Sequence, residues 1–237
     1  MLLPVLSAVL GILAFPPLGV YPLGLFFLVP FFIFLLQEKK LFKLLWGTFI
    51  FKFLLFLGVA FFAFEPFIFF LSILIFLVLP LAIFFLRKFT NQKYIILIAL
   101  PFLWIFGEHL QARFSLLPTY IIMPGNIFGS SPFLGLAGIG GLTLMTFLAV
   151  LINALIAAAI LQFLSLGSRS SKNYAILGGL ASLILILVFS GFLISESKLR
   201  KNAVIYQKLP AKLKIALLSN NKKFDKEFDI FKNDILS

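Results

Sequence analysis

Residues 67–86 read FIFFLSILIFLVLPLAIFFL, an apolar stretch that contains no charged side chain. About 20 apolar residues in a helix cross the hydrocarbon core of a bilayer, so this stretch alone predicts a transmembrane helix. The whole 237-residue sequence has the same character, because 62% of its residues are hydrophobic and only 12% are charged. A soluble domain usually carries about 25% charged residues. Together with a mean hydropathy of +1.15, this composition predicts an integral membrane protein.

Six further apolar segments flank this stretch, at residues 2–15, 20–37, 41–64, 94–110, 134–164 and 174–194. The first segment is short enough to suggest a signal peptide. It has no basic start and no small-residue cleavage site, and a second apolar segment follows at once, so we interpret it as a membrane helix. We expect an all-α bundle of about seven transmembrane helices over residues 1–195, followed by a basic extramembrane tail, residues 196–237.

The basic residues between the segments predict an orientation. Three alternate loops carry them, at Lys39, Lys40, Lys43, Arg87, Lys88, Lys93, Arg169 and Lys172. Cytoplasmic loops are rich in Lys and Arg, so we expect a cytoplasmic N-terminus and place the residues after 194 outside. Basic residues in the tail, among them Lys198 and Arg200, oppose this orientation. The same rule accounts for the net charge of +12, and we expect no nucleic acid as a partner.

Residue types that are scarce in the sequence exclude several kinds of chemistry. There is no cysteine, and the one histidine is His109. The sequence therefore offers no disulfide, thiolate metal site, iron–sulfur cluster or cysteine nucleophile, and no histidine-rich metal cage. We expect neither a metal nor another cofactor.

Ionisable residues inside apolar segments are costly and mark candidate sites. Lys52 is one, and it is either the partner of an acid or lipid phosphate or the sign of a shifted segment boundary. Glu65 stands at a helix start, where an acid is common. Glu108, His109 and Arg113 form the densest polar group, near the outer end of the fifth segment. They predict a site for a charged lipid headgroup, an acid that orients the following loop, or ordinary interfacial residues.

Two regions do not read as spanning helices. Residues 111–133 read QARFSLLPTYIIMPGNIFGSSPF, and their prolines and glycines break a helix. We expect this loop to pack at the outer membrane boundary, as a lid or wall over a lipid-facing cavity. In the tail, residues 214–219 read as a short strand, and residues 224–235 carry an amphipathic helical stripe. This pattern indicates the first βα unit of a larger domain; a helix on the membrane surface is the alternative.

The order of these pieces resembles the apolipoprotein N-acyltransferase family. The resemblance lies in LAFPPLGVYPLG at 13–24, ALPFLWIFGEHLQARF at 99–114, SPFLGLAGIGGLTLMTFLAVLINALIA at 131–157 and KIALLSNNKKFDKE at 214–227. No single motif is specific, and the order and spacing carry the resemblance. The sequence departs from the family at Gln111, where the family usually has arginine, and at LPTY ending in Tyr120, where it has Gly-Phe-Pro-Trp.

The resemblance implies an enzyme of the bacterial inner membrane that moves an acyl chain from a phospholipid to the N-terminal lipidated cysteine of a lipoprotein. In this family a nitrilase-like domain with a Glu-Lys-Cys triad performs the reaction. Because the chain has no cysteine and holds at most the start of that domain, we expect it to be catalytically incomplete by itself.

The resemblance also implies partners and a binding region. The expected partners are membrane phospholipid, a lipoprotein N-terminus and a separate nitrilase-like subunit. We place lipid and substrate binding at Trp104, Glu108, His109, Arg113 and Tyr120. Two alternatives remain open. One is a small carrier or channel that uses Lys52, Glu108 and His109 as intramembrane polar sites, and the other is a non-catalytic membrane scaffold.

Overall fold

The computed structural model describes residues 1–60, 66–89, 93–114, 122–130 and 136–164, with single positions between 179 and 197. All regular elements in these ranges are helical. They are α1 (Leu2–Ala14), η1 (Tyr21–Leu25), α2 (Val29–Gln37), α3 (Leu41–Ala60), α4 (Pro66–Phe76), α5 (Val78–Phe89), α6 (Lys93–Phe114), η4 (Pro124–Ser130) and α7 (Ala137–Leu164). The predicted all-α membrane bundle is confirmed.

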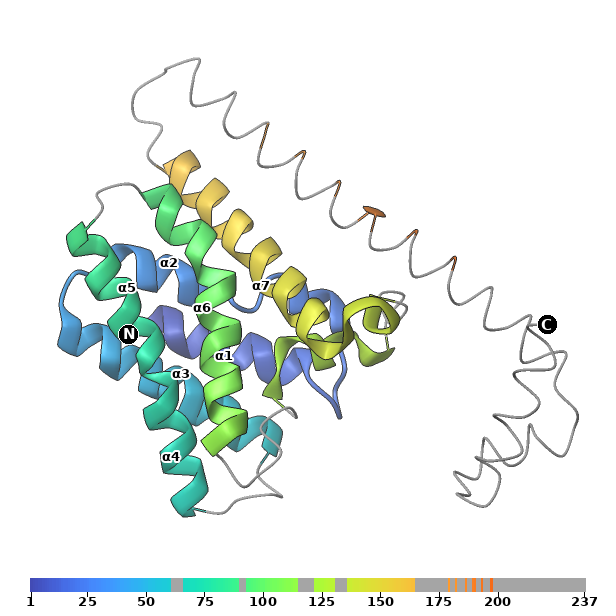
Figure 1. Ribbon diagram of the computed structural model, residues 1–237, viewed down its shortest axis with the longest axis horizontal. Coiled ribbons are helices and arrows are strands. Elements are labelled where there is room, and N and C mark those ends of the chain that lie inside the picture. The colour runs from blue at the N-terminus through green and yellow to red at the C-terminus, as the bar shows by residue number, and fades with distance from the viewer. Residues whose placement is uncertain are drawn as a thin grey trace, which may run out of the picture. The chain divides into compact units, whose positions relative to one another are not determined.

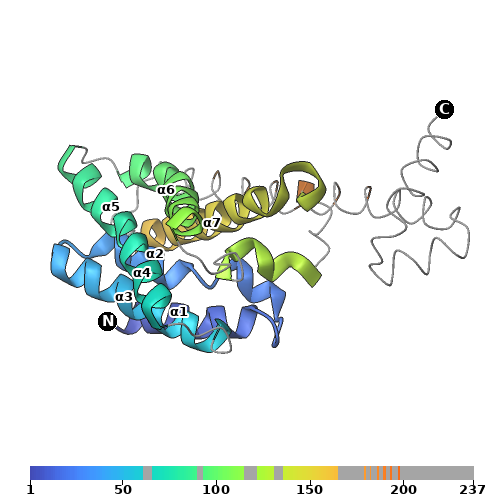
Figure 2. The ribbon, with the colours of Figure 1, turned by 60° about the horizontal axis from the view of Figure 1, so that its bottom comes forward.

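The helices pack in pairs around α2. Helix α1 packs along α3, helix α6 packs along α7, and α2 contacts both α1 and α7. Figure 1 shows α6 and α7 side by side, and the turned view in Figure 2 shows α2 between the α1–α3 pair and the α6–α7 pair. This arrangement places the middle of α2 in the core.

Four spans in the described residues are long and apolar enough to cross a membrane: Leu41–Val59, Phe70–Phe89, Ile95–Arg113 and Ile139–Leu164. Helices α1 and α2 are shorter, with 13 and 9 residues. At 1.5 Å per residue they extend only about 20 and 14 Å, less than the ~30 Å of a hydrocarbon core. The predicted seventh segment lies outside the described residues except for single helical positions, so the count of seven stays a prediction.

The stretch at 67–86 forms one span that is broken in its middle. Helix α4 ends at Phe76, Leu77 is a turn, and α5 begins at Val78. Pro80 explains the break, because it has no N–H to bond the carbonyl of Phe76 and its ring crowds that carbonyl. Here the structure corrects the expectation of a single continuous helix.

The second segment is also interrupted, between η1 and α2, and a polar side chain from α7 supports the interruption. Asn153 is fully buried. Its Oδ1 accepts a hydrogen bond from the Leu28 N–H (2.9 Å), and its Nδ2 donates to the Gly24 carbonyl (2.9 Å). Ser7 donates to the Phe27 carbonyl from α1. Irregular backbone at membrane depth must find such partners inside the protein.

Helix α7 bends near its start. Gly140 has φ −136° and ψ 19°, and Gly141 has φ 65° and ψ −164°. The conformation of Gly141 is open almost only to glycine, since a Cβ would be strained there. The bend separates the first turn of α7 from its long apolar part, which packs against α6.

Arg87 ties the end of α5 to the end of α2. Its guanidinium donates hydrogen bonds to the carbonyl oxygens of Leu35 and Glu38. The last carbonyls of a helix have no helical partner and carry the negative end of the helix dipole, so a cation is favourable there. The loops after α2 and α5 therefore lie on the same side of the bundle, as their shared basic character predicts.

By its contacts the chain divides into two compact units, Met1–Ser195 and Glu196–Ser237. The second unit lies outside the described residues apart from Ser197. The strand and helix predicted for the tail therefore stay predictions.

Candidate functional site

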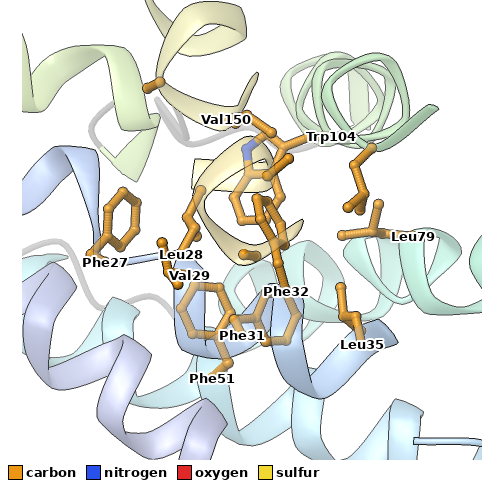
Figure 3. Close-up of a cluster of buried hydrophobic side chains, with 14 of the residues drawn as sticks. Phe27, Leu28, Val29, Phe31, Phe32, Leu35, Phe51, Leu79, Trp104 and Val150 are labelled. Atoms are coloured by element: carbon orange, nitrogen blue, oxygen red, sulfur yellow. The ribbon is translucent and has the colours of Figure 1, made fainter. Parts of the chain in front are cut away.

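Trp104 lies at the centre of the core. It has no exposed surface, and Figure 3 shows it above Phe32 and near Phe31 and Phe51. The ring centroids of Phe32 and Phe76 lie 5.9 and 4.9 Å from that of Trp104, both in edge-to-face geometry. A side chain without exposed surface cannot touch a lipid at the bundle surface. Trp104 therefore contributes to any site through its neighbours.

The neighbour that Trp104 holds is Glu108, one turn further along α6. The indole Nε1–H of Trp104 donates a hydrogen bond to Oε1 of Glu108 at 2.7 Å. Glu108 is only 4% exposed. A hydrogen bond to a carboxylate is stronger than one between neutral groups, and it fixes the direction of the side chain. Glu108 thus faces the interior of the bundle.

Lys52 reaches the same region from α3. It is 3% exposed, and its Nζ lies 3.7 Å from the ring centroid of Phe76 and 5.2 Å from that of Trp104. Lys52 and Glu108 therefore both lie beside Trp104. Of the two alternatives for Lys52, the structure argues against a shifted segment boundary, because the residue is buried well inside α3.

Gln111 continues the buried face of α6. It is 1% exposed, and its Nε2 donates to the Ser72 carbonyl of α4 at 2.6 Å. The sequence marked this position only as a departure from the family pattern. In the structure, the Gln111 side chain links α6 to α4 beside Glu108.

His109 and Arg113 lie on a different face of α6. Both are exposed, and Nδ1 of His109 contacts the Ile105 carbonyl at 3.1 Å. Phe102 and Phe106 share this face and are 61% and 54% exposed. The polar group predicted from the sequence is therefore divided: Glu108 points inward, whereas the two basic side chains point outward. Tyr120 lies outside the described residues.

A partly open apolar recess lies between η1, η4 and α7. Its lining residues are all apolar: Leu25, Phe128, Leu136, Met145, Leu148, Ala149 and Ile152. Residues 122–130 belong to the loop that we expected to form a wall, and in this described part Ile122, Ile127 and Phe128 are buried.

Gly125 allows η4 to approach α7 closely. Its N–H donates to Oγ1 of Thr146 at 3.1 Å, and a Cβ at this position would meet the Leu142 carbonyl oxygen at 2.7 Å. The described part of the loop therefore packs on the bundle and lines the recess.

A family model for the apolipoprotein N-acyltransferase N-terminal domain matches residues 7–155. The chain belongs to this family. The match covers more than half of the chain and includes Lys52, Glu108 and Asn153, so the resemblance suggested by the sequence is confirmed. The chain is an apolipoprotein N-acyltransferase-like membrane domain and a multi-pass membrane protein. No curated protein matches it.

Among the described residues, no three His, Asp or Glu side chains come together. Sequence reasoning missed Asn153, Gln111 and Phe76 as partners of polar groups. Asn153 could have been found from the sequence, because an Asn inside an apolar helix needs a hydrogen-bonding partner.

Proposed function

We propose that this chain is the lipid-handling membrane part of a lipoprotein N-acylation system in the bacterial inner membrane. The reaction transfers an acyl chain from a phospholipid to the N-terminal lipidated cysteine of a lipoprotein. The match of residues 7–155 to the N-terminal domain of apolipoprotein N-acyltransferase carries the proposal. The helical bundle and the exposed basic residues His109 and Arg113 on α6 support the proposal.

Phospholipid binds along the exposed face of α6. His109 and Arg113 lie near the end of the span Ile95–Arg113, and Phe102 and Phe106 lie below them on the same face. A cation at headgroup depth can form charge-assisted hydrogen bonds with a lipid phosphate. The aromatic side chains then contact the acyl chains.

The acyl-transferring nucleophile comes from outside these 237 residues. The family reaction passes through a cysteine thioester, and this sequence contains no cysteine. We propose a nitrilase-like catalytic subunit as the partner that supplies it, with the tail 196–237 as the start of a domain of that type. The lipoprotein N-terminus is then presented at the extracytoplasmic side.

The orientation follows from the charged loops. The N-terminus and the loops after α2 and α5 lie in the cytoplasm, and the tail lies outside. Reporter fusions after Lys40 and after Lys201 should then report opposite sides of the membrane. If both report the cytoplasm, the extracytoplasmic tail and the proposed partner contact are refuted.

A binding assay and an activity assay test the proposal together. The purified chain is reconstituted with phospholipid, and retained lipid is measured by native mass spectrometry for Arg113→Ala and for Lys88→Ala. Lys88 is an exposed cation in the last turn of α5 and is the matched control. We expect roughly tenfold weaker retention for Arg113→Ala, the loss of one charge-assisted hydrogen bond, and little change for the control. Equal losses would refute a specific site.

The activity assay uses phospholipid and a diacylated lipopeptide. The chain alone should form no N-acylated lipopeptide, and addition of a nitrilase-like catalytic domain of the family should produce it. Product from the chain alone would contradict the assignment of the nucleophile to a partner.

A further inference from the structure

Two opposite charges lie inside the membrane part of the bundle, and each is almost completely buried. Lys52 is 3% exposed and Glu108 is 4% exposed. Lys52 lies about 16 Å along the helix axis from Leu41, the first residue of α3, at 1.5 Å per residue. Its side chain is too short to bring the ammonium back to that membrane surface. The charge must therefore be compensated where it lies.

The surroundings of Lys52 are aromatic. The ammonium lies over the face of Phe76, 3.7 Å from the ring centroid, and 5.2 Å from that of Trp104. Aromatic faces attract a cation but supply no negative charge. Among the described residues, Lys52 forms no hydrogen bond or ion pair within contact distance. Glu108 is the buried acid in this region, and it lies beside the same indole ring as Lys52.

Glu108 is held in place for this purpose by Trp104, whose indole N–H donates to Oε1 at 2.7 Å. Trp104 thus contacts both members of the pair. The other described basic side chains cannot replace Lys52, because His109 and Arg113 are exposed on another face of α6. The remaining ones lie near the other end of the bundle, at Lys39, Lys40, Lys43, Arg87 and Lys88.

The two charges come from helices that do not pack along each other. Helix α3 packs on α1 and α5, and α6 packs on α7, α4 and α5. We infer that Lys52 and Glu108 act as one charge pair that couples α3 to α6 through Phe76 and Trp104. Neither charge is tolerated without the other. The pair thereby positions the outer turn of α6, which carries His109 and Arg113.

A double-mutant cycle tests this inference. Thermal unfolding midpoints are measured in one detergent for Lys52→Met, Glu108→Gln and the double variant, with Lys88→Met as control. Lys88 also lies over aromatic rings, 5.2 Å from the centroid of Phe84, but at the exposed end of α5. Each single variant leaves one buried charge uncompensated and should lower the midpoint by on the order of 10 °C. The double variant should return to within a few degrees of the wild type, and the control should not change.

Two results would overturn the inference. In the first, Lys52→Met unfolds at the wild-type temperature, which would show that Glu108 needs no counter-charge. In the second, the double variant loses the sum of the two single losses, which would show that the residues act independently. If a single variant does not fold, the yield of folded double variant decides: recovery supports the pair and no recovery refutes it. Lipid retention plays no part in this test, so failure of the proposed function would not affect its outcome.

Discussion

Replacement of Asn153 by alanine should destabilise the bundle strongly, because two buried backbone groups lose their hydrogen-bond partner at once. Asn153 is the partner of two backbone groups, the Leu28 N–H and the Gly24 carbonyl, at the interruption between η1 and α2. The Gly24 carbonyl lies near the end of the 3₁₀-helix η1 and the Leu28 N–H lies in the turn before α2, where the regular pattern of helical hydrogen bonds is interrupted. Alanine at 153 leaves both groups without this partner in a buried, apolar region.

The size of the effect follows from these two groups. A buried polar group left without a partner costs about 1–3 kcal/mol. Interhelical side-chain hydrogen bonds in membrane proteins average less, ~0.6 kcal/mol, because the groups find new partners. Since the interruption restricts such repair, we expect about 3 kcal/mol for Asn153→Ala. For a chain of this length that is a decrease of roughly 10 °C in the unfolding midpoint.

Intrinsic fluorescence can follow this unfolding, because the chain has 2 tryptophans and Trp104 is fully buried. Thr48→Val is the matched control. Thr48 is equally buried, but its hydroxyl donates to the Leu44 carbonyl within its own helix at 2.8 Å. Its removal should cost less than about 1 kcal/mol, because the backbone keeps its helical bonds. If Asn153→Ala and Thr48→Val lower the midpoint equally, the reasoning about the interruption is refuted.

Two further predictions concern the backbone of α7 and the loop after α2. Gly141→Ala should lower stability by roughly 1–3 kcal/mol, because φ is 65° and ψ is −164° there; a midpoint equal to wild type would show that the bend relaxes at no cost. The pKa of Glu38 is lowered by the hydrogen bond from the Lys40 backbone N–H, with a further contribution from the charge of Lys43. A lowered carboxyl pKa contributes stability at neutral pH, and this contribution is lost as the pH falls below about 4.5 through the folded-state value. Glu38→Gln should therefore flatten the acid end of the stability–pH curve, and an unchanged curve would contradict this assignment.

The membrane class and the family could be read from the sequence. Hydropathy over residues 67–86 depends only on the local composition, so it needs no knowledge of neighbours. The order of short motifs likewise identified the family before any contact was known, and the family match over residues 7–155 agrees with it. The sequence also held a local signal for the break at Leu77, which we did not use: Pro80 lies three residues later and removes a helical hydrogen bond there.

The candidate site was only partly predictable. Lys52 and Glu108 stood out because charges are rare in apolar segments, but nothing in the sequence brought them together. Glu108 and His109 are neighbours in the chain, yet a helix turns about 100° per residue, so one points inward and the other outward. The sequence grouped them because it does not show which face of α6 is covered.

That limit has a physical cause. Lipid tails are as apolar as the core of a bundle, so lipid-facing and buried positions carry the same kinds of side chain. In a soluble protein, the hydrophobic pattern of a helix indicates which face is buried. In a membrane protein, it indicates only that the helix crosses the membrane. Composition by itself therefore determined that this chain lies in a membrane. Only the tertiary structure decided that Trp104 is central, that Lys52 and Glu108 both lie beside it, and that Asn153 supports an interruption more than a hundred residues earlier in the chain.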